Sequence, residues 1–264
     1  MKTINSTSNS TIKFIRSLKQ KKERESSGLY YVEGIRLVGE AVRTQQRFTY
    51  VVVCFDLLDS SFGKELISEI TAKGINIISV SQTIFESISL KEGPQGIAAV
   101  LEEKWEDLNT ITRNKGLWVA LDSVQDPGNL GSILRSSDAA GGKGVILLDK
   151  SADPYHPTAV RASMGGIFSQ KIIKSSLEEF SQWKNTNKYH IVGTMCGERL
   201  NYRRYNYPKD MILLMGSEQK GLLAVHVHVC DKLITIPMKG TVDSLNLSNA
   251  ASIVLFEILA QHSG

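Results

Sequence analysis

The segment Ile236–Ala260 (IPMKGTVDSLNLSNAASIVLFEILA) constrains the fold of this chain most, because a strand end, a polar loop and an apolar helix follow each other in it without a break. Its apolar residues recur at three-and-four spacing, which predicts a helix with one face docked on a sheet; they are Ala250, Ile253, Val254 and Ile258. The start of such a helix presents unpaired N–H groups to the loop before it. The segment predicts either a ligand site at that loop or an ordinary strand-loop-helix connection.

Two further segments have the same pattern. In Leu121–Gly141 (LDSVQDPGNLGSILRSSDAAG) a turn shaped by Pro127 and two glycines follows an apolar strand. In Leu213–Leu222 (LLMGSEQKGL) an apolar strand breaks at Gly216 into polar residues. All three segments therefore predict a strand, a loop and a helix in that order.

From Leu117 onward, short apolar runs alternate with helical stretches, which is typical of a parallel sheet with helices on both faces. We expect its strands at Leu117–Leu121, Val145–Leu148, His190–Thr194, Met211–Met215 and Lys232–Ile236. A dinucleotide-binding fold is disfavoured, because no G-x-G-x-x-G follows the first strand and the glycine cluster at 141–144 comes after a helix.

The region from about Gly28 to Leu101 forms a separate alternating series. We expect strands at Tyr30–Val32, Tyr50–Cys54, Asn76–Val80 and Gly96–Leu101, with helices near Ile35–Arg43 and Lys64–Ala72. The acidic segment that follows has no sustained period. We therefore predict a small α/β domain at residues 1–103, a linker at 104–115 and a larger α/β domain at 116–264.

Composition excludes several classes of protein. No apolar run approaches the roughly 20 residues that span a bilayer, and the first residues are polar, unlike a signal peptide. The three cysteines, Cys54, Cys196 and Cys230, are too few and too far apart for a disulfide scaffold and fit a reducing compartment. We therefore expect a cytoplasmic protein without a membrane segment.

The positive charge is concentrated at the N-terminus. The net charge is +4, yet the first 25 residues carry seven Lys or Arg against two Glu. Ile12, Ile15 and Leu18 recur every third residue there, which predicts a short amphipathic helix with its lysines pointing outward. That face is either a solvated surface or one that contacts the phosphates of a nucleic acid.

The three strand-loop-helix segments, in their order and spacing, resemble the three motifs of the SpoU (TrmH) branch of the SPOUT superfamily of RNA ribose methyltransferases. Pro154–Phe168 (PYHPTAVRASMGGIF) is similar to the same family, so the resemblance extends from about Leu117 to the C-terminus. Tyr30–Val42 and Pro94–Val100 resemble the ends of an N-terminal domain that many SpoU enzymes carry, which has the fold of a ribosomal RNA-binding protein. The resemblance implies a homodimer and a parallel sheet with a deep trefoil knot, a departure from the usual absence of knots.

The resemblance also implies a cofactor, S-adenosyl-L-methionine, and residues that contact it. Carried over to this chain, the cofactor-binding residues are Thr194, Gly216, Ile236, Met238 and Leu245. Gly216 suits close approach of the backbone, and the apolar side chains suit the walls of a pocket. Taken singly, each apolar residue is more simply explained as core packing.

The catalytic residues that the resemblance implies are Arg135, Asn129, Glu218, Ser244 and Asn246. The family assigns activation of the ribose 2′-hydroxyl to Arg135. Because a guanidinium keeps its proton at neutral pH, we expect this side chain to orient the hydroxyl or stabilise its developing charge instead of acting as a base. Asn129 would fix the nucleotide, and Glu218 would hold Arg135 or another donor. A carboxylate that merely favours a helix N-terminus is the alternative for Glu218.

Other basic residues are candidates for RNA binding: Lys13, Lys19, Lys21, Lys22, Arg24, Arg36, Arg203 and Arg204. The last two alternate with tyrosines in Arg199–Lys209, a mixture that stacks bases but that equally suits a loop pinned on a dimer partner. We predict no metal site. His226, His228 and Cys230 have the spacing of ligands on a strand, but the family places a helix there, on which they scatter.

Together these features predict an RNA (ribose-2′-O)-methyltransferase that acts as a homodimer on structured RNA. Ribosomal RNA is the first expectation for the substrate, because the appended domain resembles a ribosomal-protein fold. Transfer RNA is the alternative substrate. A non-catalytic RNA-binding relative that acts in ribosome assembly is the alternative class, although the chain retains all five catalytic positions.

Overall fold

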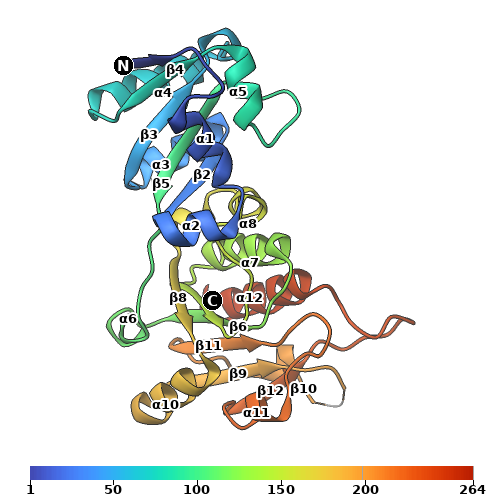
Figure 1. The fold of residues 1–264 in the computed structure, drawn as a ribbon. Coiled ribbons are helices and arrows are strands. Elements are labelled where there is room, and N and C mark those ends of the chain that lie inside the picture. The colour runs from blue at the N-terminus through green and yellow to red at the C-terminus, as the bar shows by residue number, and fades with distance from the viewer. Residues whose placement is uncertain (198, 264) are drawn as a thin grey trace. The chain divides into compact units, whose positions relative to one another are not determined.

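The computed structural model describes residues 1–197 and 199–263 and has a mixed α/β fold (Figure 1). The chain folds as two compact units. The first comprises Met1–Glu103 with Tyr155–Arg161, and the second comprises Lys104–Pro154 with Ala162–Gly264. No helix in the described part of the chain is both long and apolar enough to cross a membrane.

The first unit contains a five-stranded sheet in the order β1-β4-β3-β5-β2. Its strands are β1 (Lys2–Ile4), β2 (Leu29–Glu33), β3 (Phe48–Val53), β4 (Ile77–Val80) and β5 (Ile97–Glu102), and only β5 runs antiparallel to its neighbours. Its helices are α1 (Ser10–Ser17), α2 (Lys21–Ser27), α3 (Ile35–Arg43), η1 (Phe55–Leu57), α4 (Ser61–Ala72) and α5 (Gln82–Ile88). The sequence did not predict β1, which has only three residues and one buried side chain, or α5.

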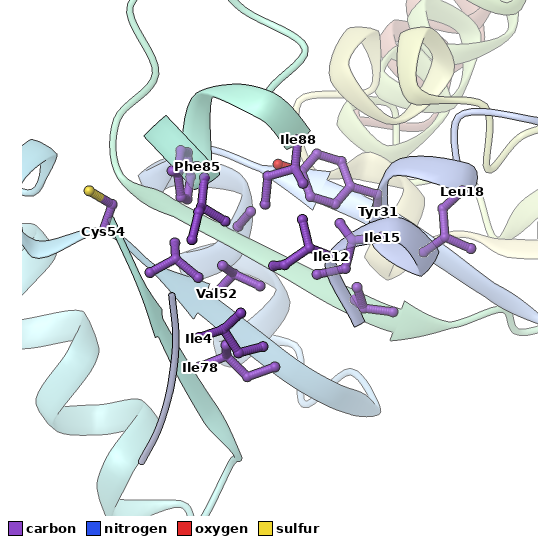
Figure 2. Close-up of a cluster of buried hydrophobic side chains, with 14 residues drawn as sticks. Ile4, Ile12, Ile15, Leu18, Tyr31, Val52, Cys54, Ile78, Phe85 and Ile88 are labelled. Carbon is purple, nitrogen blue, oxygen red and sulfur yellow. The ribbon is translucent and has the colours of Figure 1, made fainter. Parts of the chain in front are cut away.

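The predicted amphipathic helix is α1, and its apolar side chains form part of the core of the first unit. Ile12, Ile15 and Leu18 are at most 1% exposed and pack in one cluster with Val52 of β3 and Phe85 of α5 (Figure 2). Asn9 caps the helix by accepting a hydrogen bond from the N–H of Thr11. The every-third-residue spacing thus determines which face of α1 is buried.

The second unit contains a seven-stranded sheet in the order β10-β12-β9-β11-β6-β7-β8, and every pair is parallel. Its strands are β6 (Leu117–Asp122), β7 (Gly144–Leu148), β8 (Lys171–Ser175), β9 (His190–Thr194), β10 (Leu200–Asn201), β11 (Met211–Met215) and β12 (Lys232–Thr235). The five predicted strands are all present. β8 was missed, because its polar ends hide a buried Ile172–Ile173 centre, and the two-residue β10 is too short to give a pattern.

Helices cover both faces of this sheet (Figure 1). The helices after Glu103 are α6 (Asn109–Arg113), α7 (Pro127–Ala139), α9 (Gly166–Ser169), α10 (Leu177–Asn187), η2 (Tyr202–Arg204), α11 (Ala224–Val227) and α12 (Leu247–Ser263), together with α8 (Pro157–Ala162), which belongs to the first unit up to Arg161. Segment 104–115, predicted as a linker, contains α6, and its Glu106 forms an isolated bridge with Ile173. On one face, Trp118 and Ile212 pack in a cluster with Phe180 of α10.

The strand order brings the three motif segments to one edge of the sheet. β12, β9, β11 and β6 are consecutive neighbours, and the motif loops follow β6, β11 and β12. Because the strands are parallel, their carboxyl ends lie at the same edge, so these loops converge although they are far apart in sequence. α7 and α12, which follow the first and last motif loops, pack side by side, with Ser136 Oγ 2.7 Å from Ser252 Oγ (Figure 1).

We predict that α1 contributes to stability as a core element. Ile15→Ala removes a fully buried side chain, so it should lower the free energy of unfolding by about 2–5 kcal/mol. Lys13→Ala, on the exposed face of the same helix, is the matched control and should change it by less than about 0.5 kcal/mol. Urea denaturation followed by circular dichroism measures both. Equal effects of the two variants would show that α1 does not pack as described.

Candidate active site

A cavity of about 400 Å³ lies among the loops at this edge of the second unit. Its walls come from the ends of β9, β11 and β12 and from the start of α12. The lining residues are 194–196, 215–222, Ile236, Met238, Asp243, Ser244, Leu245, Leu247 and Ala250. Its size falls within the range of small-molecule sites.

All five residues predicted to bind the cofactor line this one cavity. They are Thr194, Gly216, Ile236, Met238 and Leu245. They come from three loops, so their joint placement is not explained by packing within one element. Ser244, one of the predicted catalytic residues, lines the same cavity.

Gly216 is required by the shape of its own loop. A Cβ atom there would lie 2.0 Å from the carbonyl carbon of Gly221, far inside van der Waals contact. The chain folds back on itself at this point, and the N–H of Gly221 donates to the carbonyl of Ser217 at 2.9 Å. Gly221 has a φ of 58°, in the left-handed region that favours glycine. The two glycines therefore shape the loop itself, in addition to any approach of a ligand.

A hydrogen-bond network joins the three motif loops. Asn129 Nδ2 donates to Glu218 Oε1 at 3.2 Å, and Asn246 Nδ2 donates to Asn129 Oδ1 at 2.9 Å. Asn246 Oδ1 in turn accepts from the N–H groups of Ser248 and Asn249 at the start of α12. Three predicted catalytic residues thus share one network. Asn129 and Glu218 are 89 positions apart in the sequence, and Asn246 and Asn129 are 117 positions apart.

Glu218 also holds the loop that precedes α7. Its two carboxylate oxygens accept the N–H groups of Gln125 and Asp126, at 3.1 and 3.2 Å. Partial burial acts to raise the pKa of Glu218, but the hydrogen bonds from Gln125, its own backbone, Asn129 and Asp126 outweigh that effect and hold the pKa below its ordinary value. The carboxylate is therefore ionised and serves as an acceptor, not as an acid.

Arg135 lies apart from the cavity. It is exposed on α7, six residues and about 9 Å of helix rise beyond Asn129. Of the two partners expected for Glu218, the structure shows the other donor, Asn129, and not Arg135. Within one chain, the donor that Glu218 holds is therefore the side-chain amide of Asn129.

The predicted RNA-binding residues differ in how they are used. Lys13, Lys21 and Lys22 are exposed, and Arg36 is exposed near the start of α3. Lys19 is exposed too, although its Nζ donates to the carbonyl of Ser89 at 3.3 Å. Lys13 of α1 and Lys21 and Lys22 of α2 are thus exposed cations, and Lys21 makes a weak contact with Glu25 at 3.7 Å.

Arg24 does not have the predicted RNA-binding role. Its side chain is 1% exposed, and its Nη1 donates to the carbonyls of Leu18 and Lys19 at 2.7 and 3.0 Å. These acceptors lie just past the end of α1, where backbone carbonyls lack a partner within the helix. The inclusion of Arg24 among the phosphate-contacting residues was therefore wrong, and its role is structural.

The tyrosine-rich loop is largely occupied by internal bonds. Tyr202 Oη accepts from Arg203, Tyr207 Oη donates to the carbonyl of Tyr202, and Tyr205 Oη lies 2.6 Å from His190 Nε2. Tyr202 and Tyr207 are buried, whereas Arg203 and Arg204 are exposed. The arginines are thus available on the surface, and two of the three tyrosines are not available for stacking on bases.

The segment that resembled a metal site is helical, as the resemblance implied. His226 is buried in α11, whereas His228 is exposed after its end. In residues 1–197 and 199–263, no group of three His, Cys, Asp or Glu side chains is placed to hold a metal ion. Sequence reasoning missed that His226 lies 3.2 Å from Asp122, because nothing in the spacing of these two residues signals the contact.

The fold and the site define a parallel-sheet α/β protein, preceded by a second α/β unit. Its small-molecule cavity is lined by the loops after β9, β11 and β12, and Glu218 joins this cavity to the loop after β6 by a hydrogen bond. The SpoU rRNA Methylase family matches residues 116–256, more than half of the chain, and the MRM3-like substrate binding domain matches residues 9–99. The chain belongs to the SpoU rRNA methylase family.

Individual relatives agree with this assignment. The chain is 28% identical to the 23S rRNA (guanosine(2553)-2′-O)-methyltransferase of Bacillus subtilis, over 98% of this chain and 99% of the relative. It is 30% identical to a 23S rRNA (uridine(2479)-2′-O)-methyltransferase of Streptomyces viridochromogenes, over 92% and 87% of the two chains. The crystal structure of an AdoMet-bound rRNA methyltransferase from Sinorhizobium meliloti superposes with a TM-score of 0.89 at 33% identity, covering 99% and 98% of the two chains.

We predict that ionised Glu218 stabilises the second unit in a pH-dependent way. A carboxyl group whose pKa is lower in the folded than in the unfolded state stabilises the fold above its unfolded pKa, and this contribution is lost as the pH falls through the folded value. Glu218→Gln should therefore lower Tm by about 2–4 °C at pH 7. The difference from the wild type should shrink as the pH falls below the ordinary value of 4.5.

Thermal melts between about pH 7 and pH 3.5 measure this difference. Glu178→Gln on α10, an exposed carboxylate of the same unit, is the control and should melt close to the wild type at both ends of the range. A Glu218→Gln difference that stays constant with pH would show that the side chain acts through packing instead of charge.

Proposed function

We propose that this protein transfers the methyl group of S-adenosylmethionine to a ribose 2′-hydroxyl of ribosomal RNA. The observation that carries the proposal is a cavity lined by the second and third motif loops, to which the Glu218–Asn129–Asn246 network joins the first motif. Both named relatives are 23S rRNA 2′-O-methyltransferases, and the structural relative is an AdoMet-bound rRNA methyltransferase.

The residues of the cavity fit the chemistry of the cofactor. Ile236, Met238 and Leu245 offer apolar walls for an adenosyl group, and the glycine-shaped loop at 216–221 offers backbone donors and acceptors. The cavity is lined by the carboxylates of Glu218 and Asp243 and by the ammonium group of Lys220. The negative charges outnumber the positive one, so the lining is compatible with a sulfonium cation. When bound, the cofactor supplies an electrophilic methyl group.

The network positions the groups around the acceptor. Glu218 fixes the amide of Asn129 and the backbone before α7, and Asn246 fixes the start of α12. Ser244 lines the cavity and would hydrogen-bond the reacting region. Arg135 supplies the planar donor that orients the 2′-hydroxyl and stabilises the negative charge that develops on it.

The position of Arg135 supports a homodimer as the active form. Within one chain, this side chain is exposed and does not line the cavity. α12, which packs on α7, exposes the apolar side chains of Ile253 and Phe256, 36% and 48%. A second copy seated on these helices would cover that apolar surface and bring an Arg135 from one chain to the cavity of the other. The trefoil knot in each chain is part of the same proposal.

The first unit and the cell compartment complete the proposal. The matched substrate-binding domain and the exposed lysines of α1 and α2 make the first unit the part that contacts RNA. Three free cysteines fit a cytoplasmic protein. Mapping of 2′-O-methyl marks across all RNAs, with and without the gene, tests the substrate: loss of a single rRNA mark supports the proposal, loss of a tRNA mark replaces the substrate, and no loss favours a non-catalytic relative.

We predict that both Arg135→Ala and Arg135→Lys lose most methyl transfer. Lysine keeps the charge but not the planar fork of donors, so each variant should lower the single-turnover rate by at least about 100-fold. S-adenosylmethionine affinity should stay within about twofold, because the proposed role of Arg135 is on the ribose hydroxyl and not on the cofactor. Arg113→Ala, an exposed arginine of α6, is the control. A near-normal rate in Arg135→Ala would overturn the catalytic role.

We predict that the exposed lysines of α1 and α2 contact phosphates. Replacing Lys13, Lys21 and Lys22 by Gln should weaken RNA binding and flatten the log–log salt dependence by up to about 0.9 per lost contact. Replacement of Lys64, Lys73 and Lys91 in the same unit is the matched control for charge. Filter binding at several salt concentrations measures the slope. An unchanged slope would make this face a solvated surface.

A further inference from the structure

A buried pair, Asp122 and His226, is bonded to the chain directly after the cavity loop 216–222 and is not used by the proposed mechanism. Asp122, at the end of β6, is 6% exposed, and His226 of α11 is 2% exposed. His226 Nε2 lies 3.2 Å from Asp122 Oδ2. Asp122 continues the alternating series Trp118 and Ala120, so it faces the side of the sheet on which α11 lies.

The contacts of His226 define which ring nitrogen carries a proton. Its Nδ1 accepts a hydrogen bond from the N–H of Leu223 at 2.9 Å, so this nitrogen is unprotonated in the structure. The ring proton is therefore on Nε2 and is donated to the carboxylate of Asp122. The side chain thus forms one bond to the backbone of its own segment and one bond to the sheet.

Leu223 is the point where the cavity loop ends. It directly follows residues 216–222, all of which line the cavity, and it precedes the first residue of α11. Glu218 ties the same loop to Gln125 and Asp126. The loop is therefore attached at two places to the chain at the end of β6 and just beyond it.

Packing alone does not explain this pair. An apolar pair of similar volume would fill the same space without the cost of removing a carboxylate from water. The hydrogen bonds from Leu223 N–H to His226 and from His226 to Asp122 are directional, whereas apolar contacts are not. Together they fix the backbone of Leu223 relative to β6. This fixed relation holds the end of loop 216–222, which lines the cavity, in one position relative to the sheet.

We propose that Asp122 and His226 are positioning residues that hold the loop 216–222 in the shape that binds S-adenosylmethionine. The inference rests on the proposed function, which assigns that cofactor to the cavity. It predicts that the pair acts on cofactor affinity and not on the methyl-transfer step, because neither residue lines the cavity.

Calorimetric titration of the full-length protein with S-adenosylmethionine tests the inference. His226→Leu fills the volume but removes both bonds, so it should raise the cofactor Kd at least about tenfold at a temperature well below its Tm. The KM for the cofactor should rise in parallel, while kcat at saturating cofactor stays within about threefold of the wild type. His228→Leu, an exposed histidine two residues away, is the matched control and should leave Kd unchanged.

His226→Asn and Asp122→Asn divide the effect between the two bonds. Asparagine at 226 offers an acceptor to the N–H of Leu223 but does not reach Asp122, and asparagine at 122 keeps an acceptor for His226 without the charge. Both should fold and show intermediate Kd values, with faster amide hydrogen exchange at Leu223 in His226→Leu and Asp122→Asn than in the wild type.

The outcomes separate this inference from the proposed function. Absence of cofactor binding by the wild-type protein would overturn the proposed function itself. Wild-type binding together with an unchanged Kd in folded His226→Leu would overturn only the positioning role. If His226→Leu does not fold, Asp122→Asn decides: a raised Kd supports the role, and a wild-type Kd with wild-type exchange at Leu223 overturns it.

Discussion

The parallel hydrogen-bonded ladder of β12, β9, β11 and β6 is the constraint on which the site depends. Its register pairs Ile212 with both Trp118 and Ile191, and Lys232 with Val192, so four strands end together at one edge. Parallel strands cannot be joined by tight turns, so each motif loop leads into a helix that crosses back over the sheet. The cavity exists because the loops after β9, β11 and β12 leave the same edge.

Side-chain hydrogen bonds then convert neighbouring loops into one site. Glu218 is central, because it accepts from the backbone before α7 and from Asn129, which in turn accepts from Asn246. Asp122 and His226 form a second, buried connection beside this network, in which Glu218 and Asn246 are exposed. Both sets start from the chain around the end of β6. Displacement of that strand end would therefore disturb both the cavity loop and the network of Glu218, Asn129 and Asn246.

The first unit shows that charge in the sequence and charge on the surface are different quantities. Arg16 donates to the backbone carbonyl and the hydroxyl of Ser87 at the end of α5, Lys19 donates to Ser89, and Arg24 is buried under α1. These three cations satisfy carbonyls at helix ends. Fewer exposed cations therefore remain than the seven basic residues of this segment suggest, and they are mainly lysines.

The sequence by itself determined the local elements, because apolar spacing fixes which face of α1 is buried and which runs form strands. For α12 the predicted face was right at Val254 and Ile258, which are buried, and wrong at Ile253, which is 36% exposed. The motif loops and the residues of the cavity were predictable from their resemblance to a family, since each motif is contiguous. Tertiary structure alone decided the rest. The burial of Arg24, the distance of Arg135 from the cavity and the contact between Asp122 and His226 depend on which elements are neighbours in space. No spacing along the chain encodes a hydrogen bond between residues more than a hundred positions apart, because that bond exists only once the strand order has brought them together.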